Sequence, residues 1–289
     1  MTNKISIRFY NDHEVRAVWS DEHGEWCFAV VDIVAAVTGS ESPRKYWSVL
    51  KTRLKKQGNE LATNCSQLKL MAADGKRYLT DCIEQSRLID LAKVIPSKAA
   101  MDFLDWLTYS DNTIDGQSRK KAYTLFESNL LDAIPVGTVK GLQQIHSYLF
   151  GGLYDFAGQI RQKTISKGGF TFCLAQYLPQ QLIKVESMPE ASFDEIADKY
   201  VEMNVCHPFM EGNGRTTRIW LDLMLKVRLQ QCIDWSKIGK IEYLQAMTES
   251  VADSTHIKQL LRDAITDDIN SREMFMKGID YSYYYEQEN

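Results

Sequence analysis

The sequence predicts two domains of different fold class: a small α+β domain, followed by a mainly α-helical domain with a short β-hairpin. Apolar and polar residues alternate near the N-terminus, as in strands, whereas beyond residue 118 apolar residues recur mostly at helical spacing. A polar, turn-rich stretch over 110–118 separates the two patterns. The 289 residues also suffice for two domains of about 100–200 residues. We therefore expect domains over 1–110 and 118–289 with a linker over 111–117.

The composition is that of an ordinary globular protein, with 44% hydrophobic and 25% charged residues. No apolar run approaches the roughly 20 residues that a membrane helix needs, and the N-terminus lacks the apolar core of a signal peptide. The six cysteines form no C-x-x-C pair, which favours reduced thiols over disulfides or a zinc site. The net charge of −4 indicates neither nucleic acid nor membrane as a global partner. We expect a cytoplasmic protein with no membrane partner.

Short strands and helices alternate in the N-terminal domain. Asn11-Asp12 and Ala73-Asp74-Gly75 are typical turns between alternating segments. Gly39 suits a helix C-cap, and Pro43 suits the first position of the next helix. Strands are expected over Ile5–Tyr10, Glu14–Trp19 and Trp26–Val31, the last of which is either a strand or its run into a helix. A hairpin is expected over Gln67–Tyr78. Helices are expected over Asp32–Val37, from Pro43 through Lys56, over Asp81–Val94 and over Ser97–Tyr109.

The second of these helices is strongly basic, which allows two interpretations. One is phosphate contact with DNA, and the other is a solvated helix face. Its surroundings, from Trp26 through Tyr46-Trp47 to the run 95–100, resemble the N-terminal domain of the Bro family, which includes phage antirepressors and is linked to DNA binding. The resemblance covers residues 1–110 and implies DNA as a partner. The basic residues are Arg44, Lys45, Lys51, Arg53, Lys55 and Lys56, with no acidic residue among them.

The second domain is expected to open with helices over 118–131 and 139–150. His146, inside the second helix, is interpreted as a packed or surface residue rather than a ligand. The turn Ser166-Lys167-Gly168-Gly169-Phe170, between short β-like segments over 163–172, predicts a hairpin. By itself it is an ordinary surface hairpin. The reactive segment described next favours a flap whose edge pairs with an extended segment of a protein substrate.

A helix leads into that reactive segment. Ser192 and Glu195 form a capping box that starts the helix, and apolar residues recur after it at helical spacing. Pro208 disfavours helical geometry at the residue before it. The helix is therefore expected to end near Cys206, with His207 at its C-terminus.

The segment 207–218 can bind a nucleotide triphosphate and activate a hydroxyl against it. His207, with an ordinary pKa of about 6.5, can take a proton at neutral pH. Glu211 suits Mg²⁺, which prefers one or two carboxylates with phosphate oxygens. The turn Gly212-Asn213-Gly214 can cradle a phosphate with its N–H groups. Arg215 and Arg218 can bind further phosphates through paired N–H groups. They lie at the positive N-terminus of a buried helix that is expected to begin at Arg215.

The letters H-P-F-M-E-G-N-G-R-T-T-R match H-x-F-x-[DE]-G-N-G-R-x-x-R, the signature of Fic-domain proteins, at each defined position. Residues 118–289 thus resemble the Fic fold, which makes the expected chain a small α+β domain followed by a mainly α Fic fold with a short β-hairpin flap. Most Fic proteins transfer AMP from ATP to a Ser, Thr or Tyr hydroxyl of another protein. Related Doc-type kinases have Lys at the position of Gly214, so the glycine favours nucleotidyl transfer.

The resemblance also implies a role for each signature residue. His207 would be the general base, and Phe209 would anchor the loop in the core. Glu211 would position Mg²⁺, and the stretch 212–214 would hold the α- and β-phosphates. The β-phosphate would lie on Arg215, and the γ-phosphate on Arg218.

The tyrosine-rich tail, helix-like over Met274–Tyr285, is by itself a packing stripe or a disordered end. Short Fic proteins, however, carry an inhibitory [ST]-x-x-x-E-[GN] helix there, which Ser282 and Glu286 match and Gln287 does not. In the family, that glutamate pairs with the second signature arginine and blocks the γ-phosphate site. The resemblance thus implies autoinhibition through an ion pair between Glu286 and Arg218.

The main hypothesis is a self-inhibited protein adenylyltransferase that uses ATP and Mg²⁺. Its partner would be a protein with a Ser, Thr or Tyr hydroxyl. Relatives of this type suggest a type II topoisomerase subunit as the target, and self-association that buries the inhibitory helix. Two alternatives stay open: a DNA-binding regulator whose Fic domain senses nucleotide, and a Fic transferase that uses another nucleotide donor.

Overall fold

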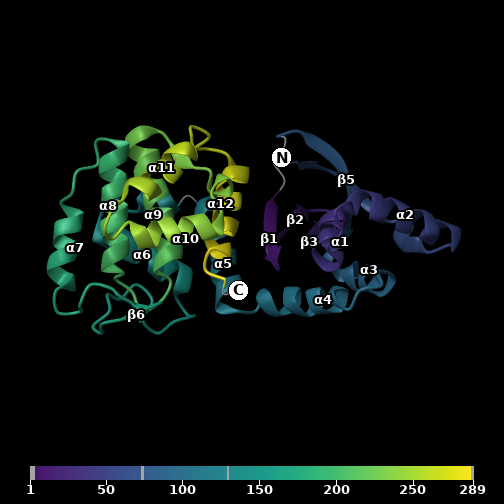
Figure 1. The fold of residues 1–289 in the computed structure, drawn as a ribbon, viewed down its shortest axis with the longest axis horizontal. Coiled ribbons are helices and arrows are strands. Elements are labelled where there is room, and N and C mark those ends of the chain that lie inside the picture. Colours follow the sequence, from purple (N-terminus) through teal and green to yellow (C-terminus); the bar gives the residue numbers. More distant parts are fainter. Residues whose placement is uncertain (1–3, 73–74, 129, 288–289) are drawn as a thin grey trace. The chain divides into compact units, whose positions relative to one another are not determined.

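The computed structural model describes residues 4–72, 75–128 and 130–287. The chain divides into two compact units, Met1–Thr113 and Ile114–Glu288. Figure 1 shows strands and helices mixed in the first unit and helices dominating the second. In the described residues, no helix combines the length and the apolar character that crossing a membrane requires.

The first unit is built on a five-stranded antiparallel sheet of order β1-β2-β3-β5-β4. Helix α1 packs against β2 and β5, and the core between sheet and helices includes Phe28, Val34 and Phe103, each almost fully buried. This unit confirms the expected α+β class. Its strands are β1 (Ile5–Tyr10), β2 (His13–Ser20), β3 (Glu25–Ala29), β4 (Ser66–Met71) and β5 (Arg77–Glu84); its helices are α1 (Val30–Thr38), α2 (Pro43–Lys56), α3 (Leu88–Val94) and α4 (Ala99–Ser110), with 3-10 turns at Glu60–Ala62 and Gln85–Arg87.

The helix expected over Asp81–Val94 is wrong in its first half. Cys82 and Ile83 belong to β5, where they pair with Ala29 and Phe28 of β3, and α3 begins only at Leu88. Both side chains are fully buried, so pairing with β3 satisfies the backbone and covers the core at once. The pairing of β4 with β5 confirms the hairpin, although Ala73 and Asp74 of its expected turn lie outside the described residues.

The second unit is organised around α9, which packs against α6, α8 and α12 and lies in the middle of the helices (Figure 1). Trp220, Leu221 and Met224 of α9 are fully buried, as the apolar pattern predicts. The helices are α5 (Ile114–Glu127), α6 (Val139–Phe150), α7 (Leu178–Glu186), α8 (Phe193–Cys206), α9 (Asn213–Leu229), α10 (Lys240–Glu249), α11 (Thr255–Asp263) and α12 (Arg272–Tyr284); short strand pairs are β6 (Ser166–Lys167) with β7 (Phe170–Thr171) and β8 (Cys232–Ile233) with β9 (Ile265–Thr266), and 3-10 turns cover Leu130–Ala133 and Trp235–Lys237.

The linker expected over 111–117 is wrong at its C-terminal end. Helix α5 already begins at Ile114, four residues before the expected start at Ser118. Gly116 and Ser118 are buried, and α5 packs against α6 and α12. The polar residues that suggest a linker here instead form the start of a helix, which belongs to the second unit.

Candidate active site

Helix α8 ends as the sequence predicts, and it presents His207 at its C-cap. The capping box of Ser192 and Glu195 is complete at its start. His207 has left-handed backbone angles, φ 47° and ψ 63°, and its N–H donates to Met203 O at 3.0 Å. Pro208 excludes a further helical residue, and the chain leaves α8 through a conformation that is rare for side chains with a Cβ.

The His207 imidazole is set up as a neutral base. Its Nδ1 lies 3.2 Å from Asn204 O, and because a carbonyl only accepts, Nδ1 carries the hydrogen and Nε2 keeps its lone pair. Burial lowers the pKa of His207 to about 4. One face of the ring stacks on Phe172, with centroids 3.7 Å apart and planes 14° apart. The ring is therefore neutral at pH 7, with one nitrogen able to accept a proton.

Only the first glycine of the expected Gly-Asn-Gly turn has a turn conformation. Gly212 is left-handed, with φ 80°, and α9 starts directly after it at Asn213 rather than at Arg215. Gly214 is helical and is small for another reason: a Cβ there would collide with the Glu286 carboxylate and lie 3.0 Å from Arg218 Nη1. The first N–H groups of α9 lack partners within the helix, so they are available to donate to an anion.

The side chain of Asn213 closes the loop. Its Oδ1 accepts from Phe209 N–H at 2.8 Å, and its Nδ2 donates to Phe209 O at 2.8 Å. This leaves the backbone of Asn213, rather than its amide, for an anion. Phe209 is fully buried, as expected for an anchor of the loop.

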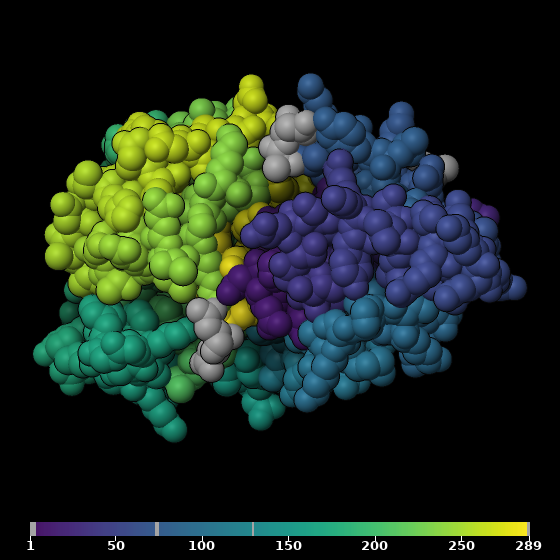
Figure 2. Space-filling view, turned by 45° about the vertical axis from the view of Figure 1, so that its right-hand side comes forward, coloured from purple at the N-terminus to yellow at the C-terminus, as the bar shows by residue number. Residues whose placement is uncertain are grey.

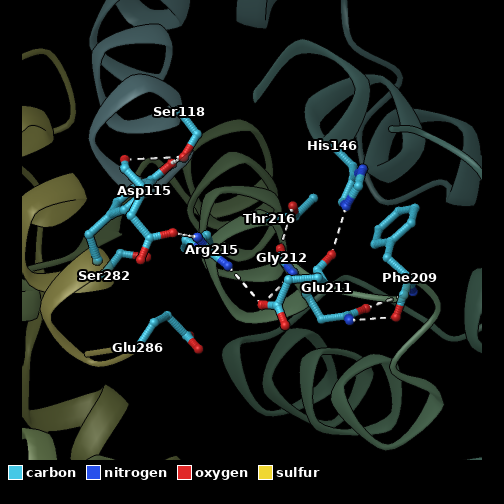
Figure 3. Close-up of polar contacts among 12 residues, drawn as sticks. Asp115, Ser118, His146, Phe209, Glu211, Gly212, Arg215, Thr216, Ser282 and Glu286 are labelled. Atoms are coloured by element: carbon cyan, nitrogen blue, oxygen red, sulfur yellow. Dashed lines mark hydrogen bonds and ion pairs between the residues drawn. The ribbon is translucent and has the colours of Figure 1, made fainter. Parts of the chain in front are cut away.

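His146 is a packed residue, as expected, and it supports the loop from α6. Gly158 N–H donates to its Nδ1 at 2.8 Å, so its Nε2 carries the hydrogen and donates to Glu211 O at 2.9 Å (Figure 3). Its ring stacks on Phe209 with centroids 3.8 Å apart. Burial lowers the pKa of His146 to about 4, which keeps this neutral tautomer in place.

Arg215 is held between two carboxylates. Its Nη2 donates to Glu211 Oε1 at 2.8 Å and its Nη1 donates to Asp115 of α5, on the opposite side of the guanidinium (Figure 3). The rings of Phe150 and Tyr283 lie 5.0 and 5.6 Å from the guanidinium carbon. The sequence does not predict Asp115 as a site residue, because it lies 100 positions before Arg215 in a stretch interpreted as a linker.

Arg218 is engaged by the tail. Glu286 Oε1 accepts from its Nη2 at 2.5 Å, so the ion pair that the resemblance implies is present. Ser282 accepts from Arg218 at 2.7 Å through both Oγ and its backbone carbonyl. Burial alone would raise the pKa of Glu286, but Arg218 and Arg215 outweigh it and hold that pKa below its ordinary value. The carboxylate is thus charged at neutral pH.

Two tyrosines complete this contact, and local sequence patterns do not predict either of them there. Arg218 Nη1 donates to Tyr243 OH at 3.1 Å. The guanidinium also lies 5.4 Å from the ring centres of both Tyr243 and Tyr285, which stack on each other. The tyrosine-rich tail therefore packs on the signature arginines, through Tyr283 on Arg215 and Tyr285 on Arg218.

The hairpin expected over 163–172 is present as β6 and β7, with Lys167 opposite Phe170 and Ser166 opposite Thr171. Gly168 and Gly169 at its turn both have positive φ, 57° and 81°. Phe172 follows β7 directly and lies on the His207 ring. The structure therefore brings the hairpin next to the expected base.

Glu211 has the chemistry of a magnesium ligand. Its side chain is 54% exposed, and its Oε1 accepts from Gly212 N–H and from Arg215. The described residues contain no group of three or more His, Cys, Asp and Glu arranged to hold a metal ion. One exposed carboxylate near the N-terminus of α9 fits the preference of Mg²⁺ for few protein ligands together with phosphates and water.

Comparison with known proteins finds a similarity within the second unit. Residues 137–225 match the Fic/DOC family. The chain is 33% identical over 153 residues to the protein adenylyltransferase VbhT of Bartonella schoenbuchensis. This alignment covers 48% of this chain and 31% of VbhT. It is 28% identical over 169 residues to the probable protein adenylyltransferase Fic of Salmonella typhimurium, covering 52% of this chain and 84% of that protein. Residues 137–225 are therefore similar to the Fic/DOC family, and the proteins similar to this chain include protein adenylyltransferases.

Solved structures of other proteins align with part of this chain. BepC of Bartonella tribocorum, crystallised with bound AMPPNP, aligns with 53% of this chain and 84% of its own at 20% identity and a TM-score of 0.46. The chain spans about a third of the length of VbhT.

Proposed function

We propose that this chain is a self-inhibited protein adenylyltransferase, which transfers AMP from ATP to a Ser, Thr or Tyr hydroxyl of another protein. The observation that carries the proposal is the neutral His207 next to the N-terminus of α9, whose Arg218 is held by Glu286. A base, an anion site and a competing carboxylate thus occur together in a domain with adenylyltransferase homologues.

The reaction follows from these positions. His207 Nε2 takes the proton of the target hydroxyl, whose oxygen attacks the α-phosphorus while the bond to the bridging oxygen of the β-phosphate breaks. Pyrophosphate leaves, and the target keeps AMP. The N–H groups at the start of α9, with Arg215 and Arg218, stabilise charge on the phosphates. Glu211 would hold Mg²⁺ against the phosphates, where the ion neutralises charge on the leaving group.

Inhibition follows from charge at the same site. Three carboxylates, those of Asp115, Glu211 and Glu286, face the two guanidiniums of Arg215 and Arg218. Glu286 therefore pairs with Arg218, the arginine proposed for the γ-phosphate. ATP must displace this carboxylate in order to bind productively.

The β6–β7 hairpin is proposed as the flap that docks the target. Its support is its place beside His207, through Phe172. Extended peptide segments pair with exposed strand edges through main-chain hydrogen bonds, and such pairing would present a side-chain hydroxyl next to the base.

The test is mass spectrometry of lysate proteins after incubation with ATP and the Glu286→Gly variant. We expect target proteins to gain one AMP on Ser, Thr or Tyr, and a type II topoisomerase subunit is the first candidate to inspect. The same incubation with Glu286→Gly combined with His207→Ala is the control. Modification by a different nucleotide would identify another donor, and no modification in any sample would contradict the proposal.

A second candidate function, DNA binding by the first unit, is favoured by the surface of α2. Five of its six basic residues are exposed, and Figure 2 shows this helix, in indigo, at the surface. Among the described residues, Lys51 is the member of the set that pairs with an acid, Asp81 at 2.6 Å. An exposed helix with cations and no acidic side chain suits phosphate contacts.

Gel shifts of the full chain with duplex DNA at increasing salt test this candidate. We expect the double substitution Lys45→Gln and Arg53→Gln to weaken binding and to reduce the slope of log affinity against log salt by about two, because about one counterion is released per phosphate contact. Lys93→Gln, an exposed lysine on α3, is the matched control. No shift at low salt, or equal slopes, would exclude α2 as a DNA-binding surface.

A further inference from the structure

We infer that Arg161 is a positioning residue, which ties the β6–β7 hairpin to His207 so that the docked target and the base keep one fixed geometry. The catalytic meaning of this inference rests on the proposed transferase function. Its structural content, that one guanidinium orients the imidazole, can be tested without activity.

Arg161 is buried, with 4% of its surface exposed, and its guanidinium donates to four main-chain carbonyls. Nε donates to His207 O at 2.7 Å, and Nη2 donates to Cys206 O at 3.0 Å. Nη1 donates to Lys163 O at 2.6 Å, and Nη2 also donates to Cys173 O at 2.5 Å. Among the described residues these partners are all carbonyl oxygens, with no carboxylate among them.

The four acceptors belong to two functional elements. Lys163 is the first residue of the expected hairpin range 163–172, and Cys173 directly follows that range. The two residues therefore lie at the two ends of the hairpin segment. Cys206 and His207 are the last helical residue and the C-cap of α8. One planar group therefore joins both arms of the proposed flap to the end of the helix that presents the base. Arginine suits this task because its fork of N–H groups is rigid, whereas a lysine ammonium is a point donor.

The same residue holds the unusual backbone of His207. A left-handed conformation is disfavoured for any residue with a Cβ. Arg161 binds the carbonyl of His207 and those on both sides of it: its side chain donates to His207 O and to Cys206 O, and its own N–H donates to Pro208 O at 2.9 Å. Because these dihedral angles set the direction of the Cα–Cβ bond, Arg161 determines where the imidazole points.

The stacking of His207 on Phe172 depends on the same link. Phe172 comes from the hairpin and His207 from α8, and their rings lie 3.7 Å apart. Hydrogen bonds from Arg161 join both elements at this place, together with the main-chain bond from Cys173 N–H to Val205 O at 3.2 Å. Nucleotide contacts, in contrast, are proposed at Arg215, Arg218 and the start of α9, none of which Arg161 touches. Loss of Arg161 should therefore uncouple transfer from nucleotide binding.

The experiment uses the full chain with Glu286→Gly, in which the nucleotide site is open, and compares Arg161→Lys, Arg161→Met and the matched control Arg228→Lys on the surface of α9. Three quantities are measured: the ¹H shifts of the His207 ring in ¹³C-histidine-labelled protein, the Kd for AMPPNP, and the rate of AMP transfer to protein. Phe172→Leu gives the size of the ring-current shift, and His207→Ala assigns the signal.

We expect both Arg161 variants to lose most of the ring-current shift, as Phe172→Leu does. The Kd for AMPPNP should stay within about threefold, and transfer should fall about 100-fold, the effect of a misplaced reacting group. Unchanged His207 shifts in both variants, or a Kd that weakens as much as transfer, would overturn the inference. Arg161→Lys carries the test if Arg161→Met does not fold. If the shifts change as expected while the parent transfers no AMP, the proposed function fails and the positioning of His207 by Arg161 stands.

Discussion

Replacing Glu286 with glycine is expected to raise both the affinity for ATP and the rate of AMP transfer by about 5–150-fold, the usual range for removing one coupled interaction. The carboxylate lies 2.5 Å from Arg218 Nη2 and is charged at neutral pH, because the neighbouring guanidiniums hold its pKa below the ordinary value. In the variant, no carboxylate competes with the γ-phosphate for Arg218. Calorimetric titration with AMPPNP measures the affinity, and labelled ATP measures transfer.

The same substitution should lower the stability of the nucleotide-free protein. Arg218 is 3% exposed and would lose its carboxylate partner, and breaking a buried pair typically costs on the order of 3 kcal/mol. Arg218 still donates hydrogen bonds to Ser282 and Tyr243, so we expect a lower Tm that AMPPNP restores. Glu286→Gln separates charge from size, and the exposed Glu242→Gln is the matched control. An unchanged affinity for AMPPNP would show that the ion pair does not gate the site.

Replacing His207 with alanine is expected to reduce AMP transfer by about 10²–10⁴-fold while leaving the affinity for AMPPNP nearly unchanged. The imidazole is at the C-cap of α8, whereas the proposed phosphate contacts lie at the start of α9. Its Nε2 has the lone pair that accepts the proton of the target hydroxyl. Single-turnover transfer in the Glu286→Gly background separates this step from binding.

The pH dependence of transfer checks the same residue independently. Burial lowers the pKa of His207 to about 4, and only the neutral ring can act as base. The rate should therefore be flat between about pH 5 and 8 as far as His207 is concerned, and should fall as the pH drops through 4. His256→Ala, at a partly exposed residue of α11 that contacts Glu249, is the control for nonspecific histidine effects. A rate that halves near pH 6.5, as for an exposed histidine, would contradict the described environment, and equal transfer by His207→Ala would exclude it as base.

The predictions from sequence that the structure bears out are mostly local ones. The capping box at Ser192, the end of α8 before Pro208 and the hairpin over 163–172 depend on neighbouring residues, so backbone preferences decide them. The pair of Glu286 with Arg218 was expected only through the resemblance to Fic proteins, since no local rule links residues so far apart. The helix expected over Asp81–Val94 shows the opposite case, because pairing with β3 outweighs helical periodicity.

The sequence by itself determined the members of the proposed reactive set: the histidine proposed as base, the carboxylate, the glycine at the start of α9 and the two arginines, all within 207–218. Tertiary structure alone decided what surrounds that set. Asp115 reaches Arg215 from α5, Tyr243 reaches Arg218 from α10, and Arg161 binds the carbonyl of His207. These contacts depend on how distant helices pack around α9, and no spacing along the chain encodes them. The physical reason is that side-chain pairing across helices is selected by burial and geometry, which exist only once the core has formed.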